Sequence, residues 1–151
     1  DIIILSDVLE HIPNTRNLLA ECIRLLRPGG SILFDFAPYF HYFGHHLWDT
    51  IQIPWLHLIT TERFRIDLYK TSVKGKVDWK ERINMRIWKV GNIEKITYLN
   101  KIKRKDFEKM ICELKCKKDV KYFMLKNMNF LSYVPMIREI FIRHIVWVIK
   151  K

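Results

Sequence analysis

Two acidic residues, a serine and a histidine follow an apolar run at the start of this sequence, and their types suit acid-base chemistry. The run is Ile2 to Leu5, and the polar residues behind it are Ser6, Asp7, Glu10 and His11. Open α/β sheets bind ligands at the carboxyl ends of their strands, so this loop is a candidate site. An imidazole with an ordinary pKa of about 6.5 is a natural proton acceptor, which makes His11 a candidate base. Alternatively, Glu10 and His11 only cap the next helix and hold the loop.

A second group of candidate ligands lies in an aromatic stretch that contains His41, His45 and His46. If the segment were helical, His41 and His45 would share one face and could bind a transition metal. No carboxylate or cysteine completes this group at a recognised spacing. We therefore expect the stretch to form an aromatic, amphipathic cover and not a metal site.

Three predicted elements must position the first polar loop. Ile2 to Leu5 consists of consecutive aliphatic residues, which is typical of a strand buried on both faces in a parallel sheet. Asn14 is a suitable N-cap for an amphipathic helix that reaches Leu26 and ends at Pro28-Gly29-Gly30. Ser31 to Phe36 is a second apolar strand, so the segment predicts a right-handed βαβ unit.

The rest of the chain contains an irregular middle and a regular end. Residues 37–64 mix aromatic residues with histidine and proline and are too long for a plain linker. The polar segment from Lys74 to Gly91 predicts a short hairpin or extended segments around Arg82 to Val90. An amphipathic helix is predicted from Arg104 to Leu114. Two further strands are predicted, at Val120 to Leu125 and Arg143 to Ile149.

Composition limits the class of protein. The chain has 151 residues, of which 49% are hydrophobic, so it can form a substantial core and is too apolar for disorder. Its cysteines, Cys22, Cys112 and Cys116, form no paired pattern, which argues against a disulfide framework and favours a cytoplasmic location. The initial apolar run lacks the features of a signal peptide, and no stretch predicts a membrane-spanning helix.

A formal net charge of +11 could indicate an anionic partner. The excess is concentrated between Lys95 and Lys126, where the spacing of the lysines is that of a solvated face. A specific nucleic-acid site is therefore not favoured. Two alternatives to an enzyme of small molecules stay open: a nucleic-acid-binding or RNA-modifying module, and a membrane-peripheral protein without catalysis.

Two sequence motifs, separated by the predicted helix, together resemble class I S-adenosylmethionine-dependent methyltransferases of the type 11-like group. They are Ile4-Leu5-Ser6-Asp7-Val8-Leu9-Glu10-His11-Ile12 and Leu26-Arg27-Pro28-Gly29-Gly30-Ser31-Ile32-Leu33-Phe34. In that family the first motif is the fourth strand with its loop, and the second leads into the fifth strand. The helix and strands at the end of the chain resemble the family's last helix and its sixth and seventh strands. The resemblance implies a Rossmann-like α/β fold with strands in the spatial order 4-5-7-6, the last strand being antiparallel.

The family's glycine-rich loop and two acidic cofactor ligands precede its fourth strand, where this sequence begins. We therefore expect a C-terminal part of one methyltransferase domain, inactive alone, whose partner is the missing N-terminal half. Its expected parts are a βαβ core at 1–38, an acceptor-side insertion or lid at 39–95, and the last helix with the closing strands at 96–151. Ile2 to Leu5 would then be an exposed apolar edge, and the isolated chain would be poorly soluble.

The resemblance also implies roles in the first polar loop. Leu5, Ser6 and Asp7 would bind the methionine side of S-adenosylmethionine, and Glu10 and His11 would face the methyl-transfer cleft as catalytic residues. Asp7, Glu10 and His11 also resemble the divalent-metal arrangement of quinone-precursor methyltransferases. We expect no metal there, because three neighbouring side chains rarely complete a site.

In this family the segment after the fifth strand often shapes the acceptor pocket. Tyr39, Tyr42, His45 and Trp48 are accordingly the candidate substrate-binding residues. Their aromatic character suits a small-molecule or lipid-like acceptor, including a lipid presented at a membrane surface. The alternative is that these residues cover the sheet as ordinary core.

Overall fold

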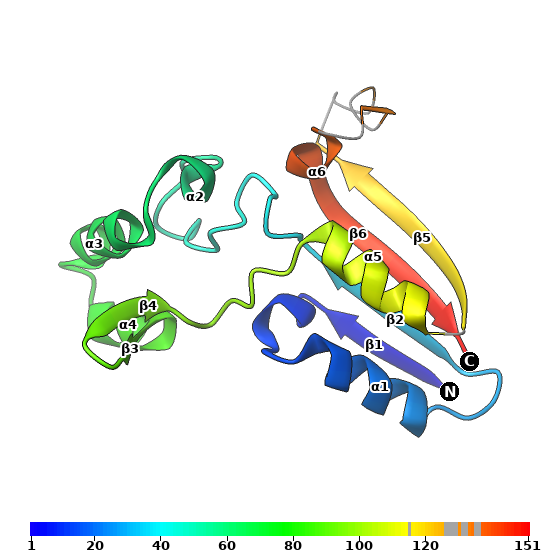
Figure 1. Ribbon diagram of the computed structural model, residues 1–151. Helices are drawn as coiled ribbons and strands as arrows, with labels where there is room; N and C mark the ends of the chain where they lie inside the picture. The colour runs from blue at the N-terminus through cyan, green and yellow to red at the C-terminus, as the bar shows by residue number, and fades with distance from the viewer. Residues whose placement is uncertain (115, 126–129, 131–132, 135–136) are drawn as a thin grey trace. The chain divides into compact units, whose positions relative to one another are not determined.

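The computed structural model describes the whole chain except residues 115, 126–129, 131–132 and 135–136 (Figure 1). It consists of two compact units. Unit 1 comprises Asp1–His41 and Asn100–Lys151, and unit 2 comprises Tyr42–Leu99. Each unit has a hydrophobic core of its own. Most of the insertion expected at 39–95 therefore lies in unit 2.

Unit 1 is built on a mixed, four-stranded sheet with the order β1-β2-β6-β5. β1 is parallel to β2, whereas β6 is antiparallel to both β2 and β5. The sheet confirms the predicted mixed α/β class, and each strand overlaps a predicted one. The strands are β1 (Ile2–Ser6), β2 (Ser31–Phe36), β5 (Lys117–Met124) and β6 (Ile142–Lys150).

The connection from β1 to β2 forms as predicted. A short 3-10 helix, η1 (Leu9–His11), precedes the helix α1 (Thr15–Leu25). The Asn14 side chain caps α1 by accepting a hydrogen bond from the Asn17 backbone N–H at 3.1 Å. After α1, Gly29 has a φ of 82°, a left-handed conformation that glycine adopts at little cost, and the chain turns into β2.

Both longer helices of unit 1, α1 and α5 (Arg104–Glu113), pack against one face of the sheet (Figure 1). Phe107 of α5 is fully buried there. Its ring makes edge-to-face contacts with Phe34, Phe36 and Trp147, with centroids 5.9, 4.8 and 5.9 Å apart. Aromatic pairs of this geometry add to the stability gained from burial alone. A short helix, α6 (Arg138–Phe141), precedes β6.

The burial of β1 differs from the prediction. Ile3 and Leu5 pack against the core, but Ile2 and Ile4 point to the other face and are 73% and 64% exposed. The prediction that this strand is buried on both faces is therefore wrong for the described residues. β1 pairs only with β2 in the described sheet, so it is the exposed apolar edge that was expected.

Unit 2 contains three helices and a hairpin. Its elements are α2 (Leu56–Ile59), α3 (Glu62–Val73), α4 (Trp79–Arg86), β3 (Ile87–Val90) and β4 (Ile93–Ile96). Tyr69 is fully buried and packs in one cluster with residues of the hairpin. The extended structure predicted around Arg82 to Val90 is correct only for β3. Residues 79–86 are helical because they are mostly good helix formers, and because Arg82 pairs with Asp78 one turn away at 2.8 Å.

The helices of the described residues are all too short or too polar to cross a membrane.

Lysine substitutions at neighbouring positions of β1 test the assignment of its two faces. Ile4→Lys should change the free energy of unfolding by less than about 0.5 kcal/mol and reduce self-association, because its side chain is on the exposed face. Ile3→Lys should cost about 2 kcal/mol or more, because it places a charge against the core. Urea unfolding and light scattering measure both effects. Equal losses of stability in the two variants would contradict the assignment.

Candidate functional site

Polar side chains from three strands of unit 1 meet at one edge of the sheet. Ser6 is the last residue of β1, and Asp35 is its register partner on β2. β6 is antiparallel to β2, so His144, near the start of β6, lies at the same edge. This edge is the carboxyl end of the two parallel strands, which is where open α/β sheets bind their ligands.

Asp35 and His144 form the centre of this group. The Ser6 hydroxyl donates a hydrogen bond to Oδ2 of Asp35 at 3.3 Å. Oδ1 of Asp35 is hydrogen-bonded to Nδ1 of His144. Because an ionised carboxylate only accepts hydrogen bonds, this partner assigns the proton to Nδ1. Nε2 of the same ring lies 3.8 Å from Oδ1 of Asp7, so the imidazole is held between two carboxylates.

Asp7 turns the chain out of β1 in an uncommon conformation. Its φ is 50°, in the left-handed region that few residues other than glycine adopt, although Asp tolerates it better than most. The Asp7 backbone N–H donates to the Asp35 carbonyl at 2.8 Å, which continues the β1-β2 pairing by one bond. Backbone strain of this kind occurs preferentially at functional sites.

Glu10 is a buried carboxylate in the loop that follows. It is only 3% exposed, and neither of its carboxylate oxygens has a hydrogen-bond partner among the described residues. Burial raises the pKa of Glu10 above its ordinary value of 4.5, and the nearby charge of Asp7 adds to the rise. Burying an unpartnered carboxylate costs stability, and folded proteins mostly retain such groups where they have a use.

Asn100 holds this loop in place. Its side-chain nitrogen donates to the carbonyls of Leu9 and Ile12 at 2.6 and 2.7 Å and lies 3.1 Å from the Thr15 hydroxyl. Its backbone N–H donates to the Glu10 carbonyl at 2.8 Å. The sequence assigned no role to Asn100, because its partners are 85 to 91 residues away along the chain.

The residues predicted for this loop are only partly brought together. Ser6 and Asp7 are exposed and lie beside Asp35, as a binding role requires. Leu5 instead packs against the core on the helix-covered face of the sheet, so its side chain points away from Ser6. His11 is exposed at the end of η1.

The predicted acceptor residues belong to different units. Tyr39 lies in unit 1, where its backbone N–H donates to the Ile102 carbonyl at 2.8 Å. Tyr42 and Trp48 lie in unit 2. The Tyr42 ring packs on Phe43 with a centroid distance of 4.3 Å, whereas Trp48 is 56% exposed. Of these side chains, Trp48 offers the largest free apolar surface.

His45 is a structural residue of unit 2. The Leu47 backbone N–H donates to Nδ1 at 2.9 Å, and Nε2 lies 3.2 Å from the Ile53 carbonyl. Burial lowers the pKa of His45, which favours a neutral ring with its proton on Nε2. Both ring nitrogens are thus used by the backbone, so substrate binding through the ring is not supported. The helix considered for His41 to His46 is also absent, because these residues form turns.

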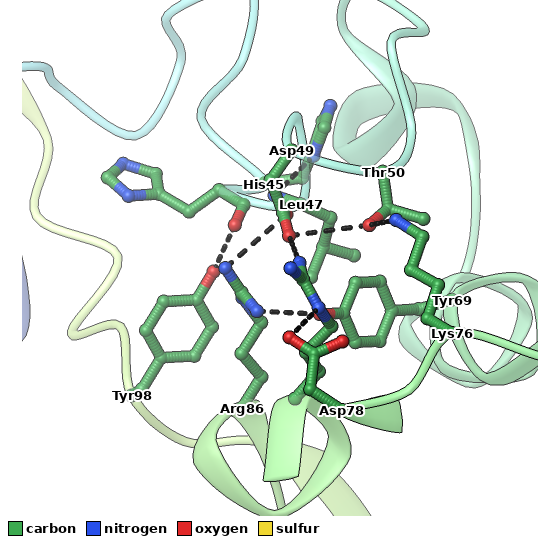
Figure 2. Close-up of polar contacts among 11 residues, drawn as sticks. His45, Leu47, Asp49, Thr50, Tyr69, Lys76, Asp78, Arg86 and Tyr98 are labelled. Carbon is green, nitrogen blue, oxygen red and sulfur yellow. Dashed lines mark hydrogen bonds and ion pairs between the residues drawn. The ribbon is translucent and has the colours of Figure 1, made fainter. Parts of the chain in front are cut away.

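Unit 2 has a polar cluster of its own around Asp49 (Figure 2). The Asp49 carboxylate lies 2.8 Å from Arg82 and 3.3 Å from Arg86. Arg86 also donates to the Tyr69 hydroxyl at 2.6 Å and lies over the Tyr98 ring. Because these guanidinium groups are already paired with carboxylates and aromatic rings, we interpret the cluster as a support for the core of unit 2.

Replacing Asn100 tests its role in holding the loop. Asn100→Ala should lower the free energy of unfolding by about 2 to 3 kcal/mol, because it leaves several backbone groups without partners. Asn100→Asp should cost at least as much, because it keeps the shape but removes the donor. Asn17→Ala, on the exposed side of α1, is the control in urea unfolding. A loss in Asn100→Asp no larger than that of the control would show that the donor is dispensable.

Replacing Glu10 tests the cost of its buried charge. A raised pKa means that the folded state binds the proton more tightly, so stability falls as the pH rises above about 4.5. Glu10→Gln should therefore raise the free energy of unfolding at pH 7 by about 1 kcal/mol and by less at pH 4. Urea unfolding at both pH values measures this difference, with Glu81→Gln at an exposed position of α4 as the control. An equal gain at both pH values would contradict the prediction.

Comparison with known protein families identifies a match at the start of the chain. Residues 1–34 match the family model described as a methyltransferase domain. No curated protein and no solved structure matches significantly. The matched segment contains Ser6, Asp7, Glu10 and His11 but ends before Asp35 and His144. The match confirms the resemblance to methyltransferases over the first part of the sequence, residues 1–34.

Proposed function

We propose that this chain belongs to an enzyme that transfers a methyl group from S-adenosylmethionine to a small-molecule or lipid-like acceptor. The observation that carries the proposal is the methyltransferase-domain match, because its polar loop lies at the carboxyl end of β1. The order β1-β2-β6-β5, with β6 antiparallel, supports equating these strands with the fourth, fifth, seventh and sixth strands of that fold.

The residues of the loop fit the methionine end of this cofactor. S-adenosylmethionine carries a sulfonium and an ammonium group there, and carboxylates attract both cations. Asp7 offers an exposed carboxylate and Glu10 a buried one without a hydrogen-bond partner among the described residues. We assign cofactor binding to Ser6, Asp7 and the backbone of Leu5. The sequence contains no Gly-x-Gly turn, so the assignment is limited to the methionine end.

The bound cofactor supplies an electrophilic methyl carbon, and the protein's main task is then to align the acceptor with it. The strand register and Asn100 hold the loop that performs this task. Glu10 and His11 are adjacent on η1 and form the proposed catalytic side of the cleft. His11 is one candidate to receive a proton if the acceptor atom carries one.

The class of acceptor is proposed from the aromatic residues. Trp48 exposes a large apolar ring, and Tyr42 lies in a cluster of rings with Phe43 and Trp55. Aromatic surface of this kind binds apolar or aromatic molecules well. These observations in unit 2 support a small apolar or lipid-like acceptor.

An NMR titration of the chain with S-adenosylmethionine at millimolar concentration tests the proposed function. We expect shifts of the backbone amides in the segment Leu5 to His11. Asp7→Asn should weaken binding by about tenfold, which corresponds to one charge-assisted contact of about 1.4 kcal/mol. Asp119→Asn, an exposed carboxylate on β5, is the matched control and should leave the affinity unchanged. Absent shifts, or equal effects of the two variants, would refute this assignment.

A further inference from the structure

We propose that Asp35 and His144 together form the proton-accepting group of this site, with Nε2 of His144 as the atom that receives the proton. The inference rests on the proposed function for its chemistry. Its geometry rests on the contact between β2 and β6 and on the position of Asp7 beside the ring. Neither residue lies in the matched segment, and the sequence suggested no role for either.

The pair has the arrangement of an oriented general base. Asp35 accepts the Nδ1 hydrogen of His144, which leaves the lone pair of a neutral ring on Nε2. A carboxylate that fixes the tautomer and orientation of a histidine is the usual support of a catalytic base. Asp7 lies 3.8 Å from Nε2, which is too long for a hydrogen bond, so it does not occupy that lone pair.

The side chains around His144 are mainly acidic or uncharged. His144 faces the carboxylates of Asp35 and Asp7, and Glu10 is close enough to interact with it electrostatically. On β5 its register partner is the uncharged Phe123, and Lys121 lies two residues along the same face of that strand. The His144 ring therefore lies against two carboxylates, with the Glu10 carboxyl group nearby.

The pair is both rigid and accessible. Both residues sit on paired strands of the central sheet, whereas His11 sits on η1 outside it. The side chains of Asp35 and His144 are 32% and 30% exposed, so a ligand at the sheet edge can reach them. Asp35 lies between Phe34 and Phe36, and His144 is followed by Ile145 and Val146, so an aliphatic residue would pack at lower cost at either position.

The lone pair of an acceptor nitrogen or oxygen forms the new bond to the methyl carbon, and the carbon–sulfur bond breaks with its electrons going to sulfur. The acceptor's proton goes to Nε2 of His144, which becomes an imidazolium between Asp35 and Asp7. The proton then leaves to water, which restores the neutral ring.

Nitrogen-15 NMR of the imidazole rings tests the pair directly. We expect His144 of the unmodified chain, when neutral, to carry its proton on Nδ1. Asp35→Asn should convert it mainly to the Nε2–H form, because the carboxylate acceptor is gone. Asp7→Asn is the matched control, since it removes a carboxylate at the same ring without touching the Nδ1 bond. An Nε2–H form in the unmodified chain, or no change in a folded Asp35→Asn variant, would contradict the proposal that Asp35 fixes the tautomer of His144.

Chemical modification tests whether Nε2 faces the site. Diethyl pyrocarbonate reacts with unprotonated imidazole nitrogens, and mass spectrometry can follow His144 and His11 separately. S-adenosylmethionine at about ten times its dissociation constant should slow modification of His144 by about tenfold. Cofactor binding without this protection would overturn the placement of the base. If no cofactor binds, the proposed function fails and the proton-accepting role fails with it, while the NMR result still decides whether the Asp35–His144 pair exists.

Discussion

The pairing of β2 with β1 on one side and β6 on the other is the constraint on which the rest of unit 1 depends. Parallel pairing brings Ser6 beside Asp35, and antiparallel pairing brings the start of β6 to the same edge. A shift of either register by one residue would turn Asp35 or His144 toward the helix-covered face. The aromatic packing of Phe107 on β2 and β6 opposes such a shift, because it fixes which face each strand buries.

The loop after β1 contains two features that are locally unfavourable. Asp7 adopts a left-handed conformation, and Glu10 buries a carboxylate without a hydrogen-bond partner in the described chain. Asn100 offsets part of this cost by binding the loop carbonyls. A loop that is unfavourable in itself but held from outside is what a preformed binding site requires, since a relaxed loop would satisfy its own polar groups.

Much of the fold could be predicted because the relevant signals are local. The Asn14 cap, the turn at Gly29 and the spacing of apolar residues in α5 depend on neighbours within a few residues. α3 was missed, although Ile66, Tyr69 and Val73 follow the helical spacing and Thr61 caps the helix. The stretch before α3 is rich in aromatic residues and histidine, which predicted a substrate-binding surface. In the structure, part of this stretch packs in the core of unit 2, and both ring nitrogens of His45 contact the backbone.

Local residue patterns were enough to predict the βαβ unit and the loop with Ser6, Asp7, Glu10 and His11. They also carry the resemblance to methyltransferases that the match over 1–34 confirms. The buried face of β1 and the distant residues that lie beside this loop follow only from the packing of the folded chain. Asp35 and His144 are 109 residues apart, and nothing in the sequence around either residue predicts their contact. Their meeting depends on strand order and register, which arise from packing across the whole sheet and leave no local pattern.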